Sequence, residues 1–186
     1  MKPLANRPLV AEPVPLDTPP LRIALVSCGK AKLTHPAPAR YLYTGSLFRA
    51  ARSYVERSGY DAWWILSARH GLVHPDEVLG PYEATLTGRG EEELTRWANK
   101  VDSRLRCSNY GLWSQAGGQI EMDIFAGKAY VDPLLSHHTL RALTETNTHT
   151  NTWTINVPHA GLQIGERLAA FAAPIHAPDP QEGPPT

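Results

Sequence analysis

The stretch from Arg22 to Ser46 reads RIALVSCGKAKLTHPAPARYLYTGS, and it decides the fold. Its apolar part, Ile23 to Val26, is short and uninterrupted, as in a strand that is buried on both faces. Small, polar and basic residues follow at once, and a polar turn at 43–46 opens a helical pattern. Ligands of open α/β sheets bind at the carboxyl ends of the strands. The stretch therefore predicts a parallel sheet with an anionic or nucleotide-like ligand at its edge.

The rest of the chain repeats this alternation of apolar runs and helical patterns. Strands are expected at residues 21–27, 62–67, 119–126 and 153–157. Helices are expected at residues 45–58, 89–106, 133–143 and 162–171, with a turn at 127–130. The order predicts an α/β fold of three layers, α/β/α, around a mostly parallel sheet of about four strands.

Length and composition indicate one domain with proline-rich ends. The chain has 186 residues, of which 42% are hydrophobic, and this suffices for one core. We expect a disordered arm at 1–20, a single α/β domain at 21–173 and a disordered tail at 174–186. No apolar run approaches the ~18 residues of a membrane span, the amino terminus lacks the apolar segment of a signal peptide, and the two cysteines give no disulfide framework. A cytoplasmic protein without a membrane partner is the simplest interpretation.

Basic residues are concentrated in one part of a chain whose net charge is zero. From Arg22 to Arg69 there are eight lysines and arginines against two acidic residues. A basic face on a neutral protein suits contact with phosphate groups. A solvated helix surface explains Arg49, Arg52 and Arg57 equally well.

The first candidate group follows the first expected strand. It is made of small and basic residues: Ser27, Cys28, Gly29, Lys30 and Lys32. The glycine lets the backbone approach a ligand closely, and the lysines can neutralise phosphate. The cysteine is either a nucleophile or a small wall residue, and we prefer the second because no His–Asp partner can be assigned to it. The spacing is neither that of a Walker A motif nor GxGxxG.

The second candidate group is the polar turn that opens the next helix: Tyr43, Thr44, Gly45 and Ser46. Thr44 or Ser46 is expected to cap this helix, and capping alone would explain either residue. The free amides of the helix end also suit an anion. Tyr43 lies beside the lysine loop and is a candidate for stacking on a base.

The third candidate group follows the second expected strand: Ser67, Arg69, His70, Asp76 and Tyr82. His70 could hydrogen-bond a leaving base, Asp76 could position water or stabilise positive charge, and Tyr82 could stack on an extruded base. The alternative is a connector in which glycine and prolines set turns and Asp76 caps a short helix. The other histidines lack zinc-site spacing, so we expect no metal and no cofactor.

These three groups carry a resemblance to a known family. The motifs at 27–32, 42–48 and 66–86, with phrases at 125–134 and 161–165, resemble the YaaA-related superfamily over roughly residues 21–170. The resemblance is to its small bacterial and phage domains of unknown function. It implies nucleic acid as the partner and a role in the response to peroxide stress. More distantly, it implies a relationship to uracil-DNA-glycosylase-like domains.

The leading hypothesis is a nucleobase- or nucleic-acid-directed α/β protein that acts like a DNA or RNA glycosylase on a modified base. It would hydrolyse the N-glycosidic bond or exchange the base, with Asp76 and His70 as the catalytic residues. Two alternatives stay open. One is a non-catalytic DNA-binding protein of the YaaA type, and the other is a small nucleotide-binding domain.

Overall fold

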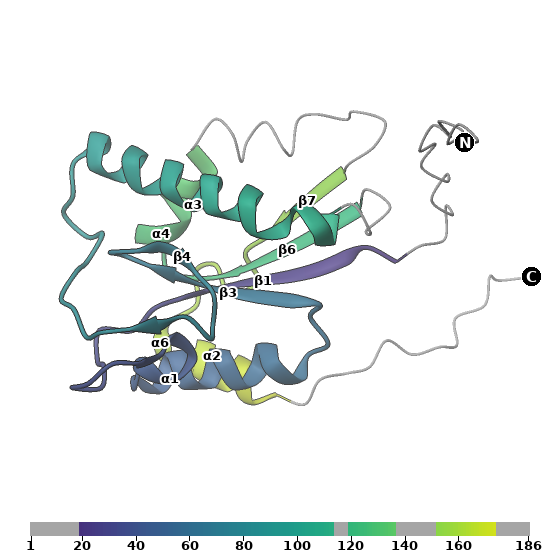
Figure 1. The fold of residues 1–186 in the computed structure, drawn as a ribbon. Coiled ribbons are helices and arrows are strands. Elements are labelled where there is room, and N and C mark those ends of the chain that lie inside the picture. The colour runs from purple at the N-terminus through teal and green to yellow at the C-terminus, as the bar shows by residue number, and fades with distance from the viewer. Residues whose placement is uncertain (1–18, 114–118, 137–151, 174–186) are drawn as a thin grey trace, which may run out of the picture.

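The computed structural model describes residues 19–113, 119–136 and 152–173, which form an α/β fold (Figure 1). In this part of the chain, the main sheet has five strands in the order β4-β3-β1-β6-β7. Their bounds are β1 Leu21–Ser27, β3 Ala62–Ser67, β4 Gly71–Val73, β6 Gln119–Phe125 and β7 Thr152–Asn156. All neighbouring pairs except β3 and β4 are parallel. The mostly parallel sheet and its four expected strands are therefore confirmed.

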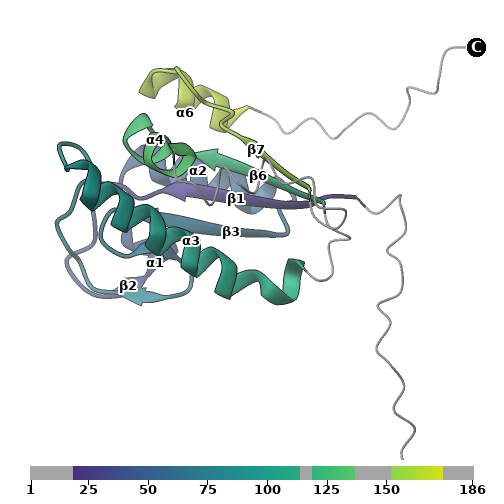
Figure 2. The same cartoon turned by 90° about the horizontal axis from the view of Figure 1, so that it is seen from above.

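Helices cover both faces of this sheet, so the three-layer prediction is also confirmed (Figure 1). The bounds are α1 Ala39–Leu42, α2 Ser46–Arg57, α3 Glu91–Trp113, α4 Lys128–Ser136 and α6 Ile164–Ala172. The helices α2 and α6 pack together on one face, and α3 and α4 lie together on the other. Figure 2 shows the sheet running from β3 through β1 to β6 and β7 between these two layers.

The order of the parallel strands reverses between β1 and β6. The chain passes from β1 to β3 through α2, and it returns across β1 to β6 through α3. Because right-handed connections that run in opposite directions lie on opposite faces, the loops after β1 and β6 diverge. In doubly wound sheets, this divergence leaves a crevice at the carboxyl edge where ligands bind.

The strand β1 lies in the middle of the sheet and is apolar toward both helix layers. Ile23 and Leu25 belong to the core cluster that includes residues of α3 and α4. Ala24 and Val26 belong to the cluster that includes residues of α2 and α6. All four are at most 1% exposed. This double burial is the physical reason why four apolar residues occur in succession, without the alternation of a half-exposed strand.

Two helices differ from the bounds expected from the sequence. The helix expected at 133–143 is α4, which begins at Lys128 and ends at Ser136, and the turn expected at 127–130 was wrong beyond Gly127. Pro133 misled the prediction because proline favours the first turn of a helix, whereas here it lies inside one. The helix expected at 89–106 runs on to Trp113 as α3. Residues 137–143 lie outside the described residues.

Short strands were missed. β4 follows β3 after a tight turn and pairs with it in antiparallel orientation. A second small sheet joins β2 (Ala37–Pro38) to β5 (Val78–Leu79). Runs of two or three residues show no periodicity, which is why the sequence pattern did not reveal them.

Gly71 takes a backbone conformation that favours glycine, with φ of +76° at the start of β4. Replacing it by alanine is expected to lower the free energy of unfolding by about 1 kcal/mol, since a Cβ is strained at positive φ. The new Cβ would lie 3.1 Å from Cγ of Lys100, a flexible side chain that can yield. Urea denaturation of the variant measures the effect. Gly80→Ala, at a glycine with negative φ and open space, is the control, and equal losses would contradict the prediction.

The predicted domain boundaries can be compared with the structure only in part. Residues 1–18 of the expected arm and the whole expected tail at 174–186 lie outside the described residues. Among the described helices, none is both long enough and apolar enough to cross a membrane.

Candidate functional site

The loop after β1 and the turn before α2 lie side by side, as the two sequence groups required. The amide of Thr44 donates to the carbonyl of Ala31 at 2.9 Å, and Lys32 and Tyr43 form an isolated antiparallel bridge. The amide of Cys28 donates to the carbonyl of Leu66 at 2.9 Å, which ties the same loop to the end of β3. The first two candidate groups therefore form one wall of the carboxyl edge.

Three buried hydroxyl groups join this wall to the third group. The hydroxyl oxygens of Tyr43 and Tyr82 are 2.8 Å apart, and those of Ser67 and Tyr82 are 2.6 Å apart. Burial raises the pKa of Tyr43 to about 12 and raises that of Tyr82 as well. Both phenols are therefore protonated at neutral pH and act as hydrogen-bond donors as well as acceptors.

Ser67 is the centre of this network and has no exposed surface. Its hydroxyl accepts from the amide of His70 at 2.9 Å and from that of Arg69 at 3.3 Å. Its carbonyl accepts from the indole of Trp97 at 2.8 Å. The serine predicted as a ligand contact is thus a structural residue that fixes the loop carrying Arg69 and His70.

His70 is half-buried beside this network. The edge of its ring meets the ring of Tyr82, with 5.0 Å between centroids. Burial, followed by the positive charges of Arg69 and Lys100, lowers the pKa of His70. A neutral imidazole can either donate or accept a hydrogen bond. His70 is not among the residues that line the two openings described below, so its contact with a leaving base stays a prediction.

We expect the His70 imidazole to titrate below the ordinary histidine value of 6.5. The unfolded chain then binds this proton more tightly than the folded one, so stability is lost as the pH falls through the ordinary range toward the lowered pKa. Imidazole NMR signals followed against pH measure the value. Arg69→Gln removes one of the causes and should raise the pKa of His70. A value at or above 6.5 in the wild-type protein would contradict the assignment.

The two lysines of the first loop have different surroundings. The ammonium of Lys32 lies 4.4 Å from the centroid of the Tyr82 ring, and it donates to the carbonyl of Lys30 at 3.1 Å. The guanidinium of Arg69 lies 5.9 Å from the same ring. Lys30 is exposed, and its ammonium has no hydrogen bond or ion pair within the described residues. Lys30 is therefore the cation most available to a ligand.

A crevice opens where the strand order reverses, with a volume of about 540 Å³. We call it the crevice, and its lining residues come from the loop after β1, the segment 83–85 and the first turn of α4: Cys28, Gly29, Lys30, Glu83, Ala84, Thr85 and Tyr130. The sulfur of Cys28 lies 3.3 Å from the hydroxyl of Tyr130. Burial raises the pKa of Tyr130, so this phenol is protonated at neutral pH. Cys28 forms part of the wall of the crevice.

A neighbouring hollow of about 500 Å³ lies along the same loop and is lined by residues 30–34 and 81–83. It shares Lys30 and Glu83 with the crevice. Glu83, an exposed carboxylic residue, therefore borders both openings. Sequence reasoning did not select Glu83, although it directly follows the predicted Tyr82.

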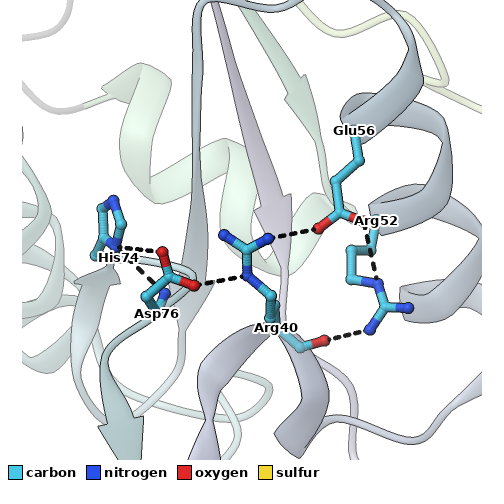
Figure 3. Close-up of polar contacts among 5 residues, drawn as sticks. All are labelled: Arg40, Arg52, Glu56, His74 and Asp76. Atoms are coloured by element: carbon cyan, nitrogen blue, oxygen red, sulfur yellow. Dashed lines mark hydrogen bonds and ion pairs between the residues drawn. The ribbon is translucent and has the colours of Figure 1, made fainter.

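Asp76, the carboxylate that the sequence favoured, lies elsewhere (Figure 3). It forms an ion pair with Arg40 at 2.9 Å, and Arg40 also contacts Glu56 at 3.2 Å. Its side chain is 63% exposed, and Asp76 is not among the residues that line the crevice or the neighbouring hollow. The structure thus brings His70 and the three loops together but leaves Asp76 in a surface ion-pair network.

The turn before α2 also differs in detail from expectation. The N-cap residue is Gly45, and no side chain caps the helix, so the expected capping by Thr44 or Ser46 was wrong. Tyr43 is 1% exposed, and its ring packs against Phe48 with 4.9 Å between centroids. Tyr82 is buried beneath Lys32. Neither tyrosine offers a free ring face to a base in this conformation.

Metal binding has no support in the described residues, where no group of three or more His, Cys, Asp or Glu side chains could hold an ion.

Comparison with known proteins gives a family but no activity. Residues 23–173 match a family described as a family of unknown function, DUF6884. The uncharacterized protein YfjM of Bacillus subtilis (strain 168) is 32% identical over 80 residues, which cover 39% of this chain and 52% of that protein. The chain thus spans about half the length of this curated relative. No solved structure matches the chain.

Proposed function

We propose that this chain, which belongs to the DUF6884 family of unknown function, binds a nucleotide unit in the crevice and hydrolyses its N-glycosidic bond. One observation carries the proposal: an available lysine and a carboxylate line the same crevice at the point where the strand order reverses. Lysine suits a phosphate, and a carboxylate suits the cationic sugar that forms as the base departs.

Each polar side chain of the crevice takes one role. Lys30 contacts a phosphate of the nucleotide, because it is exposed and without another described partner. The protonated phenol of Tyr130 donates a hydrogen bond to the base. Cys28 stays a wall residue beside Tyr130. His70 contacts the ring of Tyr82 and lies next to the exposed Arg69, on the loop that Ser67 fixes.

Glu83 is the group that acts on the reacting atoms. Its carboxylate accepts a proton from water as the water oxygen bonds to the anomeric carbon of the sugar. The bond from that carbon to the base nitrogen breaks, and the base leaves with the electron pair and takes up a proton. The negative charge of Glu83 also stabilises the positive charge that the sugar develops during this step.

Two further considerations support this assignment. The motifs after β1 and β3 resemble the YaaA-related superfamily, in which nucleic-acid binding and a distant glycosylase relationship are expected. Moreover, Arg40 and Arg52 pair with acidic residues on the surface, whereas three cations at the carboxyl edge form no ion pair within the described residues. These are Lys30, Lys32 and Arg69.

The test is incubation of the purified protein with DNA and RNA that carry native and modified bases. Released bases are measured by mass spectrometry, and abasic sites by strand cleavage. We expect release of at least one modified base. Salt-sensitive binding without any release would favour the non-catalytic nucleic-acid-binding alternative, in which Lys30→Ala with Lys32→Ala lowers affinity. Neither binding nor release would overturn the proposal.

A further inference from the structure

A second pocket lies on the opposite side of the loop after β1, between α2 and α6. Its volume is about 420 Å³. It shares Cys28, Gly29 and Lys30 with the crevice, so a single short segment separates the two openings. Apolar side chains form much of its wall, and its polar lining residues include Ser27, Lys30, Ser46 and Arg167. We call it the α2–α6 pocket.

The amino terminus of α2 opens into this pocket. Gly45 and Ser46 line it, and no side chain caps the helix. The first turn contains no acidic residue that would satisfy the amides or the helix dipole. By contrast, α6 begins with a capping box in which the Gln163 amide donates to the Glu166 carboxylate at 2.6 Å. Of these two helix ends, only that of α2 presents free donors to a ligand.

Arg167 supplies an independent observation at the same place. It lies on α6, is only 9% exposed and lines the pocket. Its Nε atom is buried without a hydrogen-bond partner, and Arg167 forms no ion pair within the described residues. Burial lowers the pKa of Arg167. The pKa of His159 is also lowered, first by its own burial and second by the positive charge of Arg167.

A buried donor without a hydrogen-bond partner, such as Nε of Arg167, is costly, and no group in the described residues compensates for it. An apolar side chain of similar length would fill the space against Phe48 and Phe171 without the desolvation cost of a charge. Arginine is instead the side chain best suited to hold phosphate through several donors in one plane. The unpaired head group therefore indicates an anion that is held in the pocket.

We propose that the α2–α6 pocket is a phosphate-binding site, in which Arg167, Lys30 and the amides of the first turn of α2 hold a phosphate monoester. Two full positive charges and the positive helix end match the charge of a dianion. The phosphate site itself does not depend on the proposed function. Only the statement that the phosphate belongs to a nucleotide rests on it. Because Lys30 borders both openings, the phosphate would lie here while the sugar and base occupy the crevice.

The test measures binding of inorganic phosphate and of a nucleoside monophosphate by calorimetry. The wild-type protein is expected to bind both, and phosphate should shift the amide NMR signals of Ser46 and Leu47. Arg167→Met should weaken phosphate binding roughly 10- to 100-fold, as expected for lost charged hydrogen bonds. Lys30→Gln should weaken it as well. Arg96→Met, at an exposed position on α3, is the matched control and should bind like the wild type.

The melting temperature of each variant is measured separately, so that a loss of phosphate binding is not confused with a loss of folding. Arg167→Met should melt at the same or a higher temperature than the wild type without phosphate, because it removes a buried nitrogen that has no hydrogen-bond partner. Added phosphate should raise the melting temperature of the wild type but not of the variant. No binding by the wild type, or equal binding by Arg167→Met, would overturn the site.

The outcomes also separate this inference from the proposed function. Phosphate binding that depends on Arg167, without release of any base, would keep the phosphate site and reject the glycosidic reaction. Base release without phosphate binding would keep the reaction and reject the site.

Discussion

Replacement of Glu83 by glutamine is expected to lower the rate of base release about 10²- to 10⁴-fold, the range typical for loss of a general base. Glutamine keeps the size of the side chain but cannot accept the water proton or offset positive charge on the sugar. Since Glu83 is exposed at the mouth of the crevice, the folded structure should be preserved. Single-turnover kinetics measure the loss, and binding of the intact substrate should change much less than the rate.

Asp76→Asn is the matched control for this experiment. Asp76 is also a carboxylate and lies between β4 and β5, but it pairs with Arg40 outside the crevice. We expect base release by Asp76→Asn within a factor of two or so of the wild type, because a surface ion pair contributes only about 0–1 kcal/mol. The reverse pattern, with Asp76→Asn inactive and Glu83→Gln active, would restore Asp76 as the catalytic carboxylate and reject Glu83.

Replacement of Ser67 by alanine is expected to lower the free energy of unfolding by about 1–3 kcal/mol, the cost of leaving buried polar groups without a partner. The hydroxyl of Ser67 accepts a hydrogen bond from the amide of His70 and forms another with the hydroxyl of Tyr82. Ser67 is 0% exposed, so bulk water does not replace these bonds. Denaturant unfolding measures the change. The His70 signal should broaden or shift as well, because the loop loses its anchor.

Ser53→Ala provides the control for Ser67→Ala. Ser53 is exposed on α2, and its hydroxyl accepts only a hydrogen bond from the Arg57 side chain at 3.1 Å. A change within about 0.5 kcal/mol is expected at such a surface position. A double-mutant cycle with Tyr82→Phe should show non-additivity, since the two hydroxyl groups are partners. Purely additive losses would mean that the network contributes no interaction of its own.

The sheet could be predicted because its signal is local. Residues 21–27 and 62–67 are apolar at successive positions, and only a strand between two helix layers needs that pattern. The strand β4 has three residues and no room for such a signal. Pro133 gave a misleading local signal, because the helix around it is stabilised by packing of Val131 and Leu134 into the core.

The candidate site could be predicted in part. The small and basic loop at 27–32 and the turn at 43–46 do lie together, because both follow from the geometry of one strand–loop–helix unit. The sequence favoured Asp76 alone, because the position of Glu83 at the crevice depends on how the segment after β5 folds back, which no local pattern reveals. Arg167 comes from the last described helix, and only the tertiary structure shows that it faces the loop after β1.

Ser67 connects the two cores of the molecule. Through Tyr82 and Tyr43 it reaches the cluster under α2, and through Trp97 it reaches the cluster under α3. Local opening events are limited by the least protected contact that must break. At this edge, the loop amide of His70 is tied through Ser67 to both cores, so we expect its hydrogen exchange to be slow. A site held in this way would need little ordering of the protein when a ligand binds.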